Sequence, residues 1–219
     1  MNAPPISPRL LKGGIVLIDP QSSAVRRVIA LQYNPDTLSR TLQVQAVGSD
    51  GQDRSEALRI KGPANETIKL DAEIDATDQL EFPDQNRSVT EFGLFPQLAA
   101  LETLVYPTSK QLQANSARQG AGELEIIPME NALTLFVWSK SRVVPVRITD
   151  FSITEEAFDA ALNPIRAKIS LGMRVLTVND VGFAHKGGSL FMSYLQNKEQ
   201  LAGLSQGGAL SALGITGIR

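Results

Sequence analysis

The feature that most constrains the fold is a short stretch, Thr67 to Asp75, in which apolar and charged side chains alternate. The apolar set is Ile68, Leu70, Ala72 and Ile74, and the charged set is Lys69, Asp71, Glu73 and Asp75. Because successive side chains of a β-strand point to opposite faces, this pattern predicts a strand with one buried and one solvated face. The chain is therefore expected to fold around a sheet.

Other segments suggest how the rest of the chain is built. Further extended segments are predicted at residues 14–19, 25–31, 41–47, 133–138, 142–151 and 167–178, with the first two paired as a hairpin. Leu98, Leu101 and Leu104 form a helical stripe, which predicts a helix over about residues 88–105. A second helix is predicted after Ser189, a residue that suits an N-cap. This order indicates a β-rich α+β fold, a β-barrel of two packed sheets with a flanking α-helix and a C-terminal helix.

Two long polar loops interrupt the extended segments, at residues 48–63 and 108–122. Long loops inside compact domains usually carry a function or become ordered against a partner. The last segment, 203–219, contains five glycines, which is too many for a stable helix. The predicted organisation is an N-terminal arm (1–13), a β-barrel domain (14–186), and a C-terminal helix with a glycine-rich tail (187–219).

The composition excludes several classes of protein. Of the 219 residues, 42% are hydrophobic and 20% are charged, which is an ordinary globular balance, so an ordered domain is expected. The net charge is -2 and no run of Lys or Arg stands out, so no nucleic-acid partner is expected. The chain has no cysteine, which removes disulfides, thiolate metal sites and cysteine nucleophiles. No apolar run of membrane-spanning length is present, so membrane insertion is not expected.

Residues with catalytic potential are few. His185 is the only histidine, and it lies in a glycine-bounded loop without a second catalytic signature, so an ordinary loop histidine is favoured over a general base. The acidic group Asp71, Glu73, Asp75 and Asp78 has hard-cation chemistry but no calcium-loop glycine at the required offset. Carboxylates at alternate strand positions favour a solvated or subunit-facing surface instead. We therefore expect no catalytic activity, no bound metal and no cofactor.

Five segments, in the same order, resemble the tube-like N-terminal domain of baseplate adaptor proteins from extracellular contractile injection systems, which are relatives of phage tails. The matching segments are LQYNPDTLSR (31–40), GPANETIKL (62–70), GLFPQLAALE (93–102), LFVW (135–138), and TEEAFD with LNPIRA (154–167). Members of this family often carry a C-terminal lysin-motif module. That module has no counterpart in this sequence, so its roles are not carried over.

The resemblance implies a structural role. A tube-like β-barrel of this kind would assemble as a homo-hexameric ring that joins a trimeric spike (hub) protein to the six-fold inner tube and initiates tube assembly. Its partners would be the spike, an inner tube or second tube-initiator protein, and other baseplate subunits. The chain would be made in the bacterial cytoplasm and end in an injection particle that is released or membrane-associated. An inner tube subunit and a small-molecule-binding β-barrel remain alternatives.

A ring subunit needs loops and sheet edges that are available to its neighbours. The loop Gly48–Pro63 and the acidic strand face of Asp71, Glu73 and Asp75 are the candidate subunit interface. Arg40, Arg54 and Arg59 are the candidate opposite charges, because charge pairing fixes the register between copies. The acidic face has a second interpretation, as part of the wall of the tube lumen.

Overall fold

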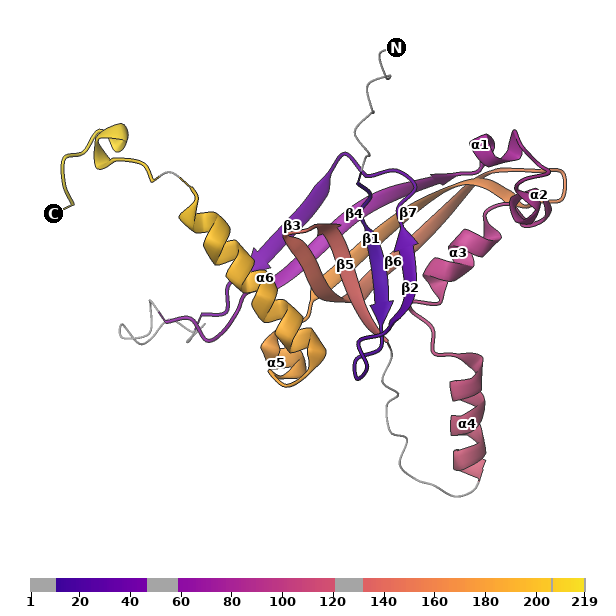
Figure 1. Ribbon diagram of the computed structural model, residues 1–219, viewed down its shortest axis with the longest axis horizontal. Coiled ribbons are helices and arrows are strands. Elements are labelled where there is room, and N and C mark those ends of the chain that lie inside the picture. The colour runs from indigo at the N-terminus through magenta and orange to yellow at the C-terminus, as the bar shows by residue number, and fades with distance from the viewer. Residues whose placement is uncertain (1–10, 47–58, 121–131, 206, 219) are drawn as a thin grey trace, which may run out of the picture.

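The strands form one antiparallel sheet. The computed structural model describes residues 11–46, 59–120, 132–205 and 207–218. The strands are β1 (Gly14–Ile18), β2 (Val25–Ala30), β3 (Leu38–Gln43), β4 (Asn65–Asp75), β5 (Leu133–Ser139), β6 (Arg142–Phe158) and β7 (Pro164–Val175). Their order in the seven-stranded sheet is β2-β1-β5-β6-β7-β4-β3 (Figure 1). The predicted β-rich α+β class and the β1–β2 hairpin are confirmed.

The long strand β6 divides the sheet into two halves. Residues 142–146 of β6 pair with β5, and residues 146–158 pair with β7, with a register irregularity between Ile148 and Asp150. Strands that pass between packed layers commonly do so at a bend or bulge. Buried residues of both halves, such as Phe136 on β5 and Leu171 on β7, belong to one hydrophobic core. The described part of the chain therefore has one seven-stranded sheet in place of the two packed sheets that were expected.

The alternation that defined β4 in the sequence is confirmed by its burial. Ile68, Leu70 and Ala72 are buried in the core, whereas Lys69 and Asp71 are exposed. We call the face that carries Ile68 the inner face and the face that carries Asp71 the outer face. A smaller core of Ile18, Leu133 and Leu135 lies on the opposite side of β1 and β5 from the main one.

The helices depart from prediction in three places, apart from two short helices, α1 and α5, that were not predicted. They are α1 (Thr77–Leu80), α2 (Arg87–Phe92), α3 (Phe95–Glu102), α4 (Ser109–Gly120), α5 (Val178–Val181) and α6 (Lys186–Gly203), followed by a 3₁₀ turn at Leu210–Leu213. The helix predicted over 88–105 is two helices, α2 and α3, separated at Gly93. The backbone of Gly93 has a φ of 55°, and the next amide, of Leu94, donates a hydrogen bond of 2.9 Å to the Pro164 carbonyl. The start of β7 thus fixes the break.

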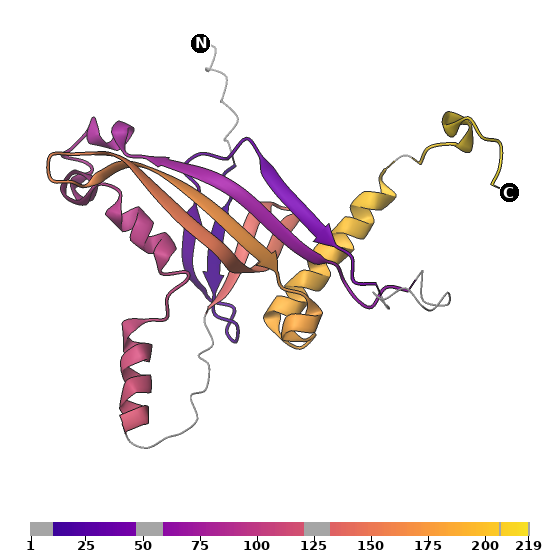
Figure 2. The same ribbon diagram turned by 180° about the vertical axis from the view of Figure 1, so that it is seen from behind.

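The other two departures concern α4 and α6. Residues 109–120, predicted as part of a loop, are helical, and α4 buries none of its residues and stands away from the sheet in both views (Figures 1 and 2). The last long helix begins at Lys186 instead of after Ser189. His185 is its N-cap, and its ring Nδ1 accepts a hydrogen bond of 3.0 Å from the Gly187 amide. The only histidine therefore has a capping role in this structure.

Replacing Gly93 with Ala tests how the break between α2 and α3 is fixed. A Cβ at this position would approach the Pro164 carbonyl oxygen at 2.5 Å, in a backbone conformation that only glycine adopts easily. We expect Gly93→Ala to lower the free energy of unfolding by about 2–4 kcal/mol in urea titrations. Gly203→Ala is the control, because a Cβ added there would have no neighbouring atom within 4 Å. Equal stability of the two variants would contradict this account.

Candidate assembly surfaces

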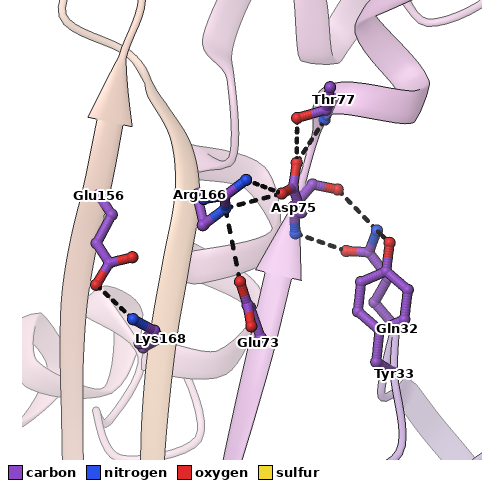
Figure 3. Close-up of polar contacts among 8 residues, drawn as sticks. All are labelled: Gln32, Tyr33, Glu73, Asp75, Thr77, Glu156, Arg166 and Lys168. Carbon is purple, nitrogen blue, oxygen red and sulfur yellow. Dashed lines mark hydrogen bonds and ion pairs between the residues drawn. The ribbon is translucent and has the colours of Figure 1, made fainter.

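The outer face of β4, β7 and β6 carries columns of opposite charge (Figure 3). Arg166 on β7 forms an ion pair of 2.8 Å with Asp75 and a longer one of 3.5 Å with Glu73. Beside it, Lys168 contacts Glu156 on β6 at 2.8 Å. Basic side chains of β7 thus stand between acidic side chains of β4 and β6. The opposite charges for Glu73 and Asp75 come from the same chain, from residues that the sequence analysis did not select.

Asp75 also fixes the end of β4. Its carboxylate accepts hydrogen bonds from the hydroxyl and the amide of Thr77, at the start of α1, and from Arg166. Its backbone is held by Gln32, whose amide group bonds both the Asp75 N–H and its carbonyl, at 3.0 and 2.7 Å. The Thr77 donors, with help from Arg166, hold the pKa of Asp75 below its usual value. Asp75 is therefore a structural anchor as well as a surface carboxylate.

An acidic hollow of about 600 Å³ adjoins this face. It is lined by Tyr33, Asn34, Pro35, Asp36, Thr37, Asp71, Glu73 and Asp75. No group of three or more His, Cys, Asp or Glu in the described residues has the arrangement of a metal site. The three carboxylates predicted from the sequence do lie together, and Asp36 from the β2–β3 connection joins them. Asp36, Asp71 and Glu73 are exposed, whereas Asp75 is half-buried.

Arg40 lies on the other face of the sheet, away from these carboxylates. It is paired with Ile68 across β3 and β4, and its side chain contacts Glu66, with the Arg40 Nε donating to Glu66 Oε1 at 2.7 Å. Lys198 on α6 donates to the second oxygen of Glu66 at 2.8 Å, and the Tyr194 hydroxyl donates to the first at 3.0 Å. The Glu66 side chain is only 4% exposed. Arg40 is thus an internal ion-pair partner that ties the edge strand β3 to β4 and α6.

The Glu66 carboxylate is ionised because of its partners. Burial acts to raise its pKa, but hydrogen bonds from Lys198 and Arg40 outweigh burial and hold the pKa below its usual value. Sequence reasoning missed this group, although the signal was present. Glu66 lies two residues before Ile68 and four before Leu70, so its side chain points to the same, inner face of the strand. A carboxylate that is buried there requires cations as partners.

The remaining predicted interface residues lie in or beside the long loop. Arg59 is exposed and precedes Ile60, which makes an isolated antiparallel bridge with Ala46. Arg54 and most of the loop Gly48–Pro63 lie outside the described residues. The structure therefore brings Asp71, Glu73 and Asp75 together, and it does not bring Arg40 to them.

The two outermost strands each have one free edge. In the described chain, β2 pairs only with β1, and β3 pairs only with β4. Every pairing in the sheet is antiparallel, and the number of strands is odd, so β2 and β3 have the same sense relative to the strands between them. Because the sheet bends along β6, their arrows nevertheless point in opposite senses in Figure 1. They are joined by residues 31–37 alone. An unpaired edge is a template for another strand, and here one lies at each end of the sheet.

A cavity of about 590 Å³ lies beside the free edge of β2. Its walls are residues 27–30 of β2, the inner-face residues Ala72 and Ile169, and the α3 residues Gln97 and Ala100. The described chain contains no helix that is long and apolar enough to cross a membrane. No protein-family model matches the sequence, and a comparison with curated proteins finds no match.

Replacing Glu66 with Gln tests the buried ion cluster. The change leaves Arg40 and Lys198 close together without the carboxylate between them. We therefore expect the free energy of unfolding at pH 7 to fall by about 3 kcal/mol. Because the pKa of Glu66 is lowered by folding, its contribution is present above its unfolded value of 4.5 and is lost as pH falls through the folded value. The difference in the free energy of unfolding between wild type and Glu66→Gln should therefore become smaller in acid.

The matched control is Lys168→Met, which removes an exposed ion pair. This substitution should lower the free energy of unfolding by less than about 1 kcal/mol. Urea titrations of all three proteins between pH 7 and pH 3 make the comparison. A gap between wild type and Glu66→Gln that stays constant with pH would contradict the role given to the Glu66 charge.

Proposed function

We propose that this chain is a non-catalytic, ring-forming baseplate subunit of a contractile injection system, which joins a trimeric spike to a six-fold inner tube and initiates tube assembly. The observation that carries the proposal is the pair of free edges, on β2 and β3, at the two ends of one sheet. The resemblance to baseplate adaptors supplies the identity of the machine. An inner tube subunit of the same kind of machine is the alternative that the same observation supports.

A contact between unlike edges, β3 with β2, gives a ring, whereas a two-fold dimer would pair like edges. When β3 of one copy pairs with β2 of the next, the pair still has one free β2 and one free β3. Such a head-to-tail contact repeats until the copies close into a ring. The junction pairs two strands that run the same way, so it is a parallel pairing inside an otherwise antiparallel sheet.

Pairing of the two edges within one chain is disfavoured by their connection. Adjacent parallel strands need a crossover of about a dozen residues or more, because the chain must return along the full strand. Residues 31–37, which connect β2 to β3, are too few for that path. The edges are thus available to other copies. The first segment of the resemblance, residues 31–40, covers this connection and the start of β3.

The outer face of β4, β7 and β6 is suited to the lumen of the ring. Glu73, Asp75 and Glu156 have their cations, Arg166 and Lys168, on the same chain. A face whose charges are balanced within one subunit needs no partner and remains wetted. In the proposed ring this face lines the channel, and the contacts between copies are made by the edges of the sheet.

Engineered disulfides across the two edges test the ring, because the native chain has no cysteine. Val28 on β2 and Ser39 and Thr41 on β3 are exposed. Val28 and Thr41 pair with Val16 and Thr67, on the outer face of the sheet. We expect one of the double variants, Val28→Cys with Ser39→Cys or Val28→Cys with Thr41→Cys, to give a ladder of covalent oligomers that ends at six copies on non-reducing gels.

The single variants are the controls. Val28→Cys alone should stay monomeric on the gel, since a head-to-tail junction brings β2 against β3 and not against a second β2. A strong dimer of that single variant would show a two-fold contact and contradict the ring. Negative-stain electron microscopy of the cross-linked product should show six-fold rings. Absence of any ladder in both double variants would overturn the proposed function.

A further inference from the structure

The cavity beside β2 follows the edge of the strand. Its lining includes the consecutive residues Arg27, Val28, Ile29 and Ala30, whose side chains alternate between the two faces of the sheet. A cavity that touches consecutive residues of a strand borders the backbone edge, where the N–H and C=O groups lie. The free hydrogen-bonding groups of β2 therefore face a recess.

The opposite wall of the recess is mainly apolar, although Glu73, Asp78 and Gln79 also line the cavity. Ala72 and Ile74 of β4, Ile169 and Leu171 of β7, and Leu101 of α3 line it. Gln97 on α3 also lines it, and the Oε1 atom of Gln97 is buried without a hydrogen-bond partner. A buried acceptor without a donor is uncommon in folded proteins and costs free energy. The recess thus has apolar space and one acceptor that needs a donor.

The chemistry of this recess favours an extended strand over a small molecule as its occupant. A small apolar ligand would fill the space but would leave the edge groups of β2 unpaired. A strand satisfies these groups and places every second side chain on the inner face. Within the described chain, β3 is the other strand with a free edge, so a second copy of this chain supplies a suitable occupant.

One residue of β3 has the properties of an anchor for this recess. Leu42 pairs with Glu66, so it lies on the inner face, and yet it is 51% exposed. It sits at the end of the strand, next to Arg40, which is held by Glu66. Leu42 belongs to neither of the two hydrophobic cores.

We propose that Leu42 of one copy inserts into the recess beside β2 of the next copy, and that the incoming chain supplies a donor to Gln97. This inference rests on the proposed ring and identifies the contact that holds it together. It assigns Leu42 and the recess as the two halves of the junction between subunits.

Two registers of β3 against β2 of the next copy place inner-face residues beside inner-face residues, and charge favours one of them. Aligning the strands end to end would place Leu42 beside Ile29, but it would also place Arg40 beside Arg27. Like charges on neighbouring strands are destabilising. A shift of two residues places Leu42 beside Leu31 and Arg40 beside Ile29, and it separates the arginines. The proposed register therefore puts Ser39, and not Thr41, beside Val28.

The two disulfide variants measure this register. We expect Val28→Cys with Ser39→Cys to form the covalent ladder faster and more completely than Val28→Cys with Thr41→Cys. The reverse order would overturn the proposed register while leaving the ring in place. Failure of both variants to form a ladder would contradict the ring itself, so the two failures are distinguishable.

Substitutions on both sides of the junction measure the contact without cysteines. We expect Leu42→Asp on β3, and Ala100→Trp in the wall of the recess, each to raise the concentration needed for ring formation by more than about tenfold in sedimentation velocity. Leu204→Asp and Ala99→Trp are the controls, since both residues are exposed and neither lines the recess. Circular dichroism melts verify that each variant remains folded.

Gln97→Met separates assembly from folding. The change keeps the size of the side chain and removes the buried acceptor, so the monomer should be as stable as wild type or more stable. Ring formation should nevertheless weaken, because the donor of the incoming chain loses its partner. If Leu42→Asp and Gln97→Met both form rings at the same concentration as wild type, the inference is overturned, but the proposed function still stands. A small molecule as the true occupant would be indicated by Ala100→Trp rings of normal stability.

Discussion

The structure depends on the division of β6 between two sets of partners. Its first residues pair with β5, its later residues pair with β7, and the irregularity at Ile148 and Asp150 lies between the two sets. The halves of the sheet therefore share one core instead of lying flat side by side. The strand order leaves β2 and β3 as the terminal strands, and the recess lies beside β2.

The Glu66 cluster adds a second constraint, at the edge of the sheet. A buried carboxylate is costly unless it is paired, and Glu66 is held by Arg40 and Lys198 with a hydrogen bond from Tyr194. These partners come from β3 and α6, which are far apart in the sequence. The cluster thereby fixes the position of the edge strand β3. An edge that is held rigidly loses less conformational entropy when it binds a second chain.

The features that could be predicted from the sequence are those that leave a local pattern of residues. The alternation in β4 correctly predicted its two faces, and the same alternation, continued to Glu66, places that carboxylate on the buried face. Its partners Lys198 and Tyr194 could not be predicted, because pairing between distant segments leaves no local sequence pattern. The helical stripe around Leu98 predicted α3, but the break at Gly93 depends on a bond to Pro164, which only the folded hairpin supplies. Asp75 was selected for its charge, whereas its partner Arg166 comes from a strand about ninety residues later. Strand order and the free edges are likewise non-local properties.

The polarity of the proposed ring follows from its head-to-tail contact, which joins β3 of one copy to β2 of the next. In an antiparallel sheet with an even number of strands, the outer edges run in opposite directions, so an edge-to-edge ring would pair antiparallel strands. With an odd number the outer edges have the same sense relative to the sheet, so a junction that continues the inner face is parallel. In both cases each junction joins two unlike edges. A cyclic ring built this way has two unlike faces. An adaptor needs that property, because it meets a trimeric spike on one side and a six-fold tube on the other. The exposed side chains of Phe92, Phe158 and Leu162 lie near the β6–β7 turn, at one end of the long strands, which supplies such an asymmetry within each subunit.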